Sequence, residues 1–163
     1  MLKKISFYLN RGAGIASFII FLSVMIVVLI DIVTRAFWTQ TLWGFELVGL
    51  LLASGIGLGM GYAQLDNHHV RIEIVYSRLP LKARKMIDLV NSTICFIVSV
   101  VVSWQLWNLA VQSLRENITT VGVYMPIFYF QYLMFIGFVL LSLQLLVDIG
   151  VYAWQLPSKR EDT

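Results

Sequence analysis

The feature that most constrains the fold is a long apolar run near the start of the chain. From Gly12 to Ile30 the sequence contains no charged residue, and about 20 mostly apolar residues suffice for a helix to cross a bilayer. Over the whole chain 59% of the residues are hydrophobic and 13% are charged, whereas a soluble domain has about 25% charged residues. Lipid must therefore cover the outside of this chain, and the sequence predicts an integral membrane protein.

Four stretches are long and apolar enough to span a membrane as helices. The predicted spans are, within several residues, 14–37, 42–64, 86–108 and 124–152. Pro80 and Pro126 each stand just before an apolar run, where the fixed φ of proline favours helix initiation. The predicted fold is an all-α membrane protein in which residues 1–163 form a single integral membrane domain.

A secretory signal peptide is the alternative interpretation of the first span, because Lys3 and Lys4 precede it. Its charge-free run is longer than the apolar region of a typical signal peptide, and no cleavage site of the small-x-small type follows. We therefore interpret this stretch as a retained transmembrane helix.

The basic residues predict the orientation of the spans. Ten lie before the first span, between the second and third, or after the fourth; only Arg35 and Arg115 lie on the other side. Cytoplasmic loops carry the excess of lysine and arginine. Both termini and the middle loop are therefore expected in the cytoplasm.

Two segments have the composition of helices that lie along the membrane surface. The segment from Asp66 to Lys85 mixes apolar and cationic residues, and so do the first ten residues, where Leu2, Ile5 and Leu9 can share a face opposite the lysines. Either these segments are surface-lying amphipathic helices, which we favour, or they are polar connectors with apolar anchors.

Ionisable residues lie only toward the ends of the predicted spans. Asp31, Arg35 and Glu46 are near the outer ends, and Asp88 and Asp148 near the inner ends. Transporters that move ions place charged groups or broken helices near the bilayer midplane. The sequence therefore argues against transport by this chain alone.

Three of these charged residues form a candidate outer cluster. Asp31 and Arg35 are four residues apart and can form an ion pair along one helix face. Glu46 lies at the same depth on the next span and could join them. The cluster either fixes the helix ends or contacts a partner protein at the outer surface.

The second span has two rows of small residues, and the third has one row. Small residues let helix backbones approach closely inside a membrane. These rows indicate packing within a four-helix bundle or docking onto another membrane subunit. The rows are Gly49, Ala53, Gly57 and Gly61; Gly55, Gly59 and Ala63; and Ser92, Cys95, Ser99 and Ser103.

The sequence gives no indication of a cofactor, a metal or an enzyme site. Cys95 is the only cysteine, and His68 and His69 are adjacent, so they cannot act as facing haem ligands from two helices. The net charge of +3 arises from short basic segments between apolar runs, which indicates membrane orientation rather than nucleic-acid binding. We expect no cofactor, no catalytic residue and no nucleic-acid partner.

Several short motifs lie in and between the predicted spans: Asp31-Ile-Val-Thr-Arg35, Trp43-Gly-Phe-Glu46, Asp66-Asn-His-His-Val-Arg-Ile-Glu73, Leu79-Pro80 and Tyr124-Met-Pro126. Together they resemble the small membrane subunit of tripartite ATP-independent periplasmic (TRAP) transporters. His69 stands at the position of a family histidine, and Glu73 where an acidic residue is common. The doubled histidine departs from the family pattern.

This resemblance implies a function that composition alone does not give. In the family a separate large membrane subunit carries the substrate and sodium sites, and an extracytoplasmic binding protein delivers an organic anion, commonly a C4-dicarboxylate or a sialic acid. The small subunit packs against the large one as a scaffold in the bacterial inner membrane, with lipid around it. The alternatives are an autonomous small transporter and a four-helix membrane anchor of a redox complex.

Overall fold

The computed structural model describes residues 2–37, 43–65, 81–122 and 124–155. These residues form four long helices: α1 (Leu2–Phe37), α2 (Trp43–Leu65), α4 (Leu81–Arg115) and α5 (Phe128–Gln155). Each contains a segment long and apolar enough to cross a membrane: Ser6–Phe37, Gly44–Leu65, Met86–Arg115 and Phe128–Val151. The predicted all-α fold with four membrane-spanning helices is confirmed.

The two segments predicted to lie on the membrane surface overlap the first turns of α1 and α4. The first residues belong to α1, which runs without a break from Leu2. Residues 81–85, at the end of the other segment, form the first turn of α4. Residues 66–80 lie outside the described residues. How these segments lie relative to a membrane surface stays a prediction.

The fourth span begins at Phe128, within the several residues allowed for its predicted start, because a small hairpin precedes it. Helix α4 ends at Arg115, and Asn117 follows with φ 50°, a left-handed cap in which the Ile118 amide donates to the Ser113 carbonyl at 3.0 Å. Thr119 then pairs with Pro126 in an antiparallel bridge. Pro126 therefore belongs to the hairpin and does not start α5.

The hairpin is held at its centre by Thr120. Its backbone amide donates to the Met125 carbonyl at 2.9 Å, and its hydroxyl accepts from the Met125 amide at 3.0 Å. Tyr124, with φ 54°, donates its amide to the Thr120 carbonyl at 3.1 Å. These local bonds compete with helix formation, which is why the helical pattern of the last span does not extend back to Tyr124.

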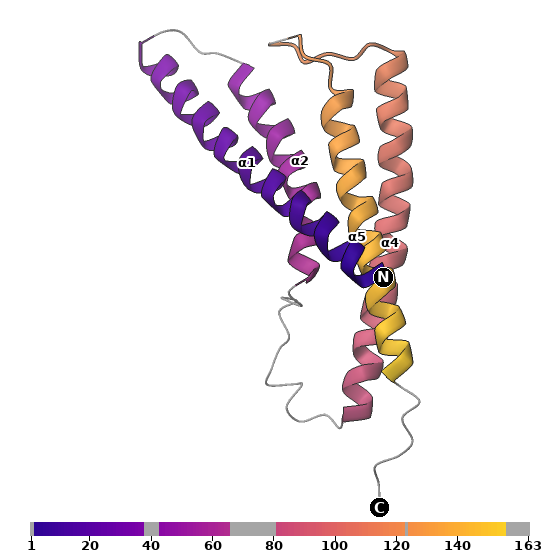
Figure 1. The fold of residues 1–163 in the computed structure, drawn as a ribbon. Helices are drawn as coiled ribbons and strands as arrows, with labels where there is room; N and C mark the ends of the chain where they lie inside the picture. The colour runs from indigo at the N-terminus through magenta and orange to yellow at the C-terminus, as the bar shows by residue number, and fades with distance from the viewer. Residues whose placement is uncertain (1, 38–42, 66–80, 123, 156–163) are drawn as a thin grey trace, which may run out of the picture.

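The helices form an open row in the order α1, α2, α5, α4 (Figure 1). Helix α5 packs against both α2 and α4, and α2 packs against α1. Helix α1 crosses α2 obliquely, so that its N-terminal part also reaches α5 (Figure 1). The two end helices of the row, α1 and α4, therefore keep wide faces without a neighbour among the described residues.

Small residues set the distance between α2 and its two neighbours. A Cβ added to Gly137 of α5 would overlap the carbonyl group of Gly57, and one added to Gly57 would lie 3.1 Å from the Met134 Cα. On the other side of α2, the Ser17 hydroxyl of α1 donates to the Gly55 carbonyl at 2.7 Å. The backbones approach this closely because no side chain separates them.

Candidate functional site

The C-terminal end of α1 and the N-terminal end of α2 meet at Asp31. We call this end of the helices outer and the opposite end inner, after the orientation that the basic residues predict. Its carboxylate forms the expected ion pair with Arg35, with 2.9 Å between Asp31 Oδ2 and Arg35 Nε. The Asp31 side chain is 15% exposed and that of Arg35 48%. Asp31 also lies against Gly44 of α2, where a Cβ would overlap its carboxylate. The glycine thus lets the first turn of α2 pack directly on this carboxylate.

Glu46 does not join this ion pair among the described contacts. Its Oε2 accepts a hydrogen bond from the Gly122 amide at 3.2 Å, at the tip of the hairpin between α4 and α5. The reason is helical geometry: Gly44 and Glu46 are two residues apart and point to opposite sides of α2. One side faces α1 and the other faces the hairpin, so the outer charges are divided between two contacts.

A groove of about 380 Å³ opens beside Glu46, between the first turns of α2 and the hairpin. Gly49 lies in it, and a Cβ added there would meet nothing within 4 Å. This position therefore differs from Gly57 and Gly61, which are both covered. The residues that line the groove are Phe45, Glu46, Gly49, Leu50, Thr119, Thr120, Val121 and Ile127.

A second, buried set of polar side chains joins the inner parts of α1, α2 and α5. We call it the inner polar cluster; it consists of Ser6, Asn10, Gln64, Gln144 and Asp148. Four of these residues are almost completely buried, with exposed fractions of 1% for Ser6, 0% for Asn10, 4% for Gln64 and 6% for Gln144. Buried polar side chains of this kind are stable only when they are hydrogen-bonded to one another.

The hydrogen bonds of the inner polar cluster run in one direction, toward the Asp148 carboxylate. Asn10 Nδ2 donates to the Ser6 carbonyl at 3.0 Å, and Ser6 Oγ donates to Gln144 Oε1 at 2.6 Å. Gln144 Nε2 donates to Asp148 Oδ1 at 3.1 Å, and Gln64 Nε2 donates to Asp148 Oδ2 at 3.0 Å. Both carboxylate oxygens of Asp148 therefore accept a hydrogen bond from a side-chain amide.

Asn10 and Gly61 form the closest contact of this cluster. The Asn10 side-chain oxygen has no hydrogen-bond partner among the described residues, and it lies against Gly61, where a Cβ would overlap it. A contact of this kind between an oxygen and a Cα–H group is weakly attractive. Gly61 therefore provides the space in which α1 packs its asparagine against α2.

The outer charges and the inner polar cluster are separated by about the thickness of a hydrocarbon core. Glu46 and Gln64 of α2 are 18 residues apart, about 27 Å at 1.5 Å per residue. On α1 the interval from Asn10 to Asp31 is 21 residues, about 31 Å along the tilted helix. A bilayer core is about 30 Å thick. The spacing of the two polar layers therefore matches the thickness of a bilayer core.

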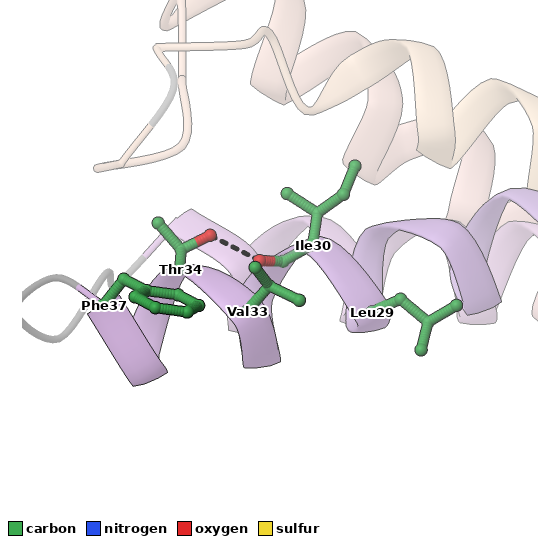
Figure 2. A pocket seen from close by; sticks show the side chains of 5 residues that line it. All are labelled: Leu29, Ile30, Val33, Thr34 and Phe37. Carbon is green, nitrogen blue, oxygen red and sulfur yellow. Dashed lines mark hydrogen bonds between the residues drawn. The ribbon is translucent and has the colours of Figure 1, made fainter.

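The exposed surface of α1 around and beyond the level of Asp31 is largely apolar. A depression of about 370 Å³ lies on this helix alone and is lined by Leu29, Ile30, Val33, Thr34 and Phe37 (Figure 2). The single polar side chain there, Thr34, donates its hydroxyl to the Ile30 carbonyl of the same helix (Figure 2). The other four side chains are apolar and the Thr34 hydroxyl is already hydrogen-bonded, so this surface is suited to contact with acyl chains.

The structure distributes the residues singled out in the sequence over several places. Gly57 lies at the α2–α5 contact and Gly61 at the contact with Asn10, while Gly49 is open and Ala53 half-buried. His69 and Glu73 lie outside the described residues. The row of hydroxyls on α4 faces α5, since Ser92, Ser99 and Ser103 are buried.

The inner polar cluster was not predicted from the sequence. Its first two members, Ser6 and Asn10, lie in the segment predicted for the membrane surface. A signal was present, because Ser6, Asn10, Ala13 and Ser17 recur at intervals of three and four residues along one face of α1. The partners on α2 and α5 could be assigned only once the helices were placed.

Comparison with known protein families gives a match over most of the chain. The model of the tripartite ATP-independent periplasmic transporters, DctQ component, matches residues 24–151. No curated protein and no solved structure matches the chain. The matched region covers more than half of the sequence and includes α2, α4, most of α5 and the outer part of α1. This multi-pass membrane protein belongs to the DctQ component family, the small subunits of TRAP transporters.

Proposed function

We propose that this chain is the scaffold subunit of a sodium-driven, binding-protein-dependent transporter for organic anions. In this proposal it packs against a large membrane subunit that carries the substrate and sodium sites. An extracytoplasmic binding protein delivers a substrate of the C4-dicarboxylate or sialic acid class. The family match to a component of tripartite transporters is the observation that carries the proposal.

The distribution of charge supports a passive role in transport. In the described helices, no Asp, Glu, Lys or Arg lies on α2 between Glu46 and Leu65, or on α5 before Asp148. Asp148 itself is engaged by Gln64 and Gln144. A dehydrated ion or organic anion crossing the membrane needs charged, polar or unwound-backbone partners at mid-depth. The described helices are also unbroken, as a scaffold requires.

The proposed location is the bacterial inner membrane, with both termini in the cytoplasm and the hairpin on the outer side. The uneven distribution of lysine and arginine supports this orientation. In it, Asp31, Glu46 and the groove beside Glu46 face the compartment in which a periplasmic binding protein operates. In this proposal all 163 residues form one membrane domain.

Reconstitution tests the proposal. The purified chain alone in liposomes should give no sodium-driven accumulation of a dicarboxylate or a sialic acid. Accumulation should appear when the large subunit and the cognate binding protein are added, and should be lost when this chain is omitted. Accumulation by the chain alone would identify it as an autonomous transporter and overturn the scaffold proposal.

The outer carboxylates provide a second test of the same proposal. Substitution Glu46→Gln should leave the sodium dependence of uptake unchanged, because no sodium site is placed there. Any effect should fall on assembly of the complex or on docking of the binding protein. An altered number of sodium ions per substrate in this variant would place Glu46 in the transport pathway.

A further inference from the structure

We propose that the face of α4 turned away from α5 is the surface on which a transmembrane helix of the large subunit packs. This inference rests on the proposed function, since it names the part of this chain that the large subunit covers. We call this face the exposed stripe of α4. It consists of Ile94, Val98, Val101, Gln105, Asn108 and Gln112, all exposed.

The exposed stripe of α4 has the spacing of a helix–helix interface. Its residues follow one another at intervals of four, three, four, three and four residues. This 3–4 alternation keeps side chains aligned with a partner helix that crosses at a small left-handed angle. The stripe lies opposite the buried hydroxyl face, which includes Ser99 and Ser103 and packs on α5. α4 is also an end helix of the row (Figure 1).

Exposed amide groups distinguish this face from the other exposed faces. Among the described side chains, every exposed asparagine or glutamine of the four helices lies on α4. On the other three helices Asn10, Gln64 and Gln144 are buried and Gln131 is half-buried. Between Arg11 and Asp31 the large exposed side chains of α1 are apolar, for example Phe18, Met25 and Leu29. Those surfaces are suited to lipid, whereas the stripe of α4 is not.

Gln105 and Asn108 lie within the hydrocarbon layer. They flank Trp107, whose ring packs against Tyr132 and Phe135 of α5, with centroids 5.8 and 5.3 Å apart. These two aromatic residues lie about 6 and 10 Å along α5 from Phe128, its first residue. The preceding residue, Ile127, lines the same groove as Glu46, which marks the outer boundary. The two amides are therefore below that boundary.

Amide groups at this depth need partners that lipid does not provide. Gln112, nearer the helix end, donates to Glu116 at 2.9 Å. No hydrogen bond joins the side-chain amides of Gln105 and Asn108 to any other part of the chain that the structure describes. Acyl chains offer neither hydrogen-bond donors nor acceptors, so an amide exposed to them loses its hydrogen bonds to water without replacement. A neighbouring helix with hydroxyl or amide side chains at this level satisfies both groups.

Site-specific photocrosslinking in the intact complex tests this assignment without disturbing the fold. A photoreactive phenylalanine derivative is placed at Val98, Val101 or Gln105, and this chain is produced together with the large subunit in membranes. Two positions serve as controls: Val100, on another side of α4, and Met25 of α1, which is 62% exposed, as Val101 is. We expect products with the large subunit from the three stripe positions and at least tenfold less from the controls.

The possible outcomes separate this inference from the proposed function. If the large subunit co-purifies but crosslinks only from the control positions, the assignment of α4 is wrong and the scaffold function stands. Crosslinks between two copies of this chain, or no protein product from the stripe, also overturn the assignment. If no large subunit co-purifies at all, both proposals fail.

A paired substitution gives an independent measurement. Replacing Gln105 and Asn108 together by leucine should weaken association with the large subunit by roughly threefold for each amide, the usual effect of one interhelical hydrogen bond in a membrane. Replacing the exposed Val100 and Met25 by leucine should leave association unchanged. Association that is unchanged or stronger in the double leucine variant would show that the amides face lipid.

Discussion

The side-chain oxygen of Asn10 lies against Gly61, in the space that a side chain at position 61 would occupy. This contact joins α1 to α2 at the inner polar cluster, where Ser6 also joins α1 to Gln144 of α5. The cluster therefore fixes three helices at one end of the membrane span. The stability of the fold should depend on this cluster more than on the partly exposed charges at the outer end.

Substitution Gly61→Ala should destabilise the fold by about 1–3 kcal/mol, the usual cost of adding a methyl group to a filled site. The matched control is Gly49→Ala on the same helix, where a Cβ would meet nothing within 4 Å. Both substitutions raise helix propensity equally, so their difference reports the contact with Asn10. Denaturant titration in mild detergent measures it, and equal stabilities would show that Asn10 can move without cost.

Substitution Gly137→Ala should cost more than Gly61→Ala, about 3 kcal/mol. The added methyl group meets the backbone carbonyl of Gly57, which cannot rotate away as an asparagine side chain can. Gly150→Ala on the same helix is the control, since nothing lies within 4 Å of a Cβ there. If Gly137→Ala and Gly150→Ala were equally stable in the same titration, the close packing of α2 and α5 would be contradicted.

Substitution Ser6→Ala should destabilise the fold by about 0.6–1.7 kcal/mol, the range measured for hydrogen bonds between membrane helices. It removes the donor to Gln144 Oε1, a bond between two helices. Ser23→Ala is the control, because the Ser23 hydroxyl bonds only to the Ile19 carbonyl of its own helix. A larger loss from Ser23→Ala would mean that the inner polar cluster contributes little.

Substitution Glu46→Leu should loosen the hairpin that precedes α5. Its carboxylate accepts the Gly122 amide, and such a bond contributes about 0.5–1.5 kcal/mol. Hydrogen exchange of residues 118–122 should therefore accelerate by roughly two- to tenfold. The exposed neighbour Phe45→Leu is the control. Exchange that is unchanged in Glu46→Leu would show that the hairpin holds its shape through Thr120 alone.

Cysteine labelling in intact cells tests the predicted orientation. In a Cys95→Ser background, a cysteine at Glu116 should react with an impermeant reagent, because the α4–α5 connection is expected outside. A cysteine at Ser77, in the basic segment between the second and third spans, should be protected. Labelling at Ser77 with protection at Glu116 would reverse the orientation derived from the basic residues.

Features that depend on neighbouring residues in the chain were predictable. The four spans follow from apolar length, and the ion pair between Asp31 and Arg35 follows from their spacing on one helix. Helix α5 begins at Phe128, within the several residues allowed for the predicted start near Tyr124, and the hydrogen bonds of the hairpin at Thr120 set this boundary by competing with helix formation. Apolar composition alone does not reveal such a turn.

What the sequence by itself determined is the number and approximate length of the membrane-spanning helices, because each must satisfy its own backbone hydrogen bonds in lipid. Only the tertiary structure decided which helices are neighbours. It brought Asn10 to Gly61 and Asp148 to Gln64, and it turned Glu46 toward Gly122 instead of Asp31. The physical reason is that lipid is as apolar as the side chains between helices, so hydrophobic pattern does not select partners. Selection depends on the shapes of small residues and on a few hydrogen bonds, and these can be assigned only when two helices are seen together.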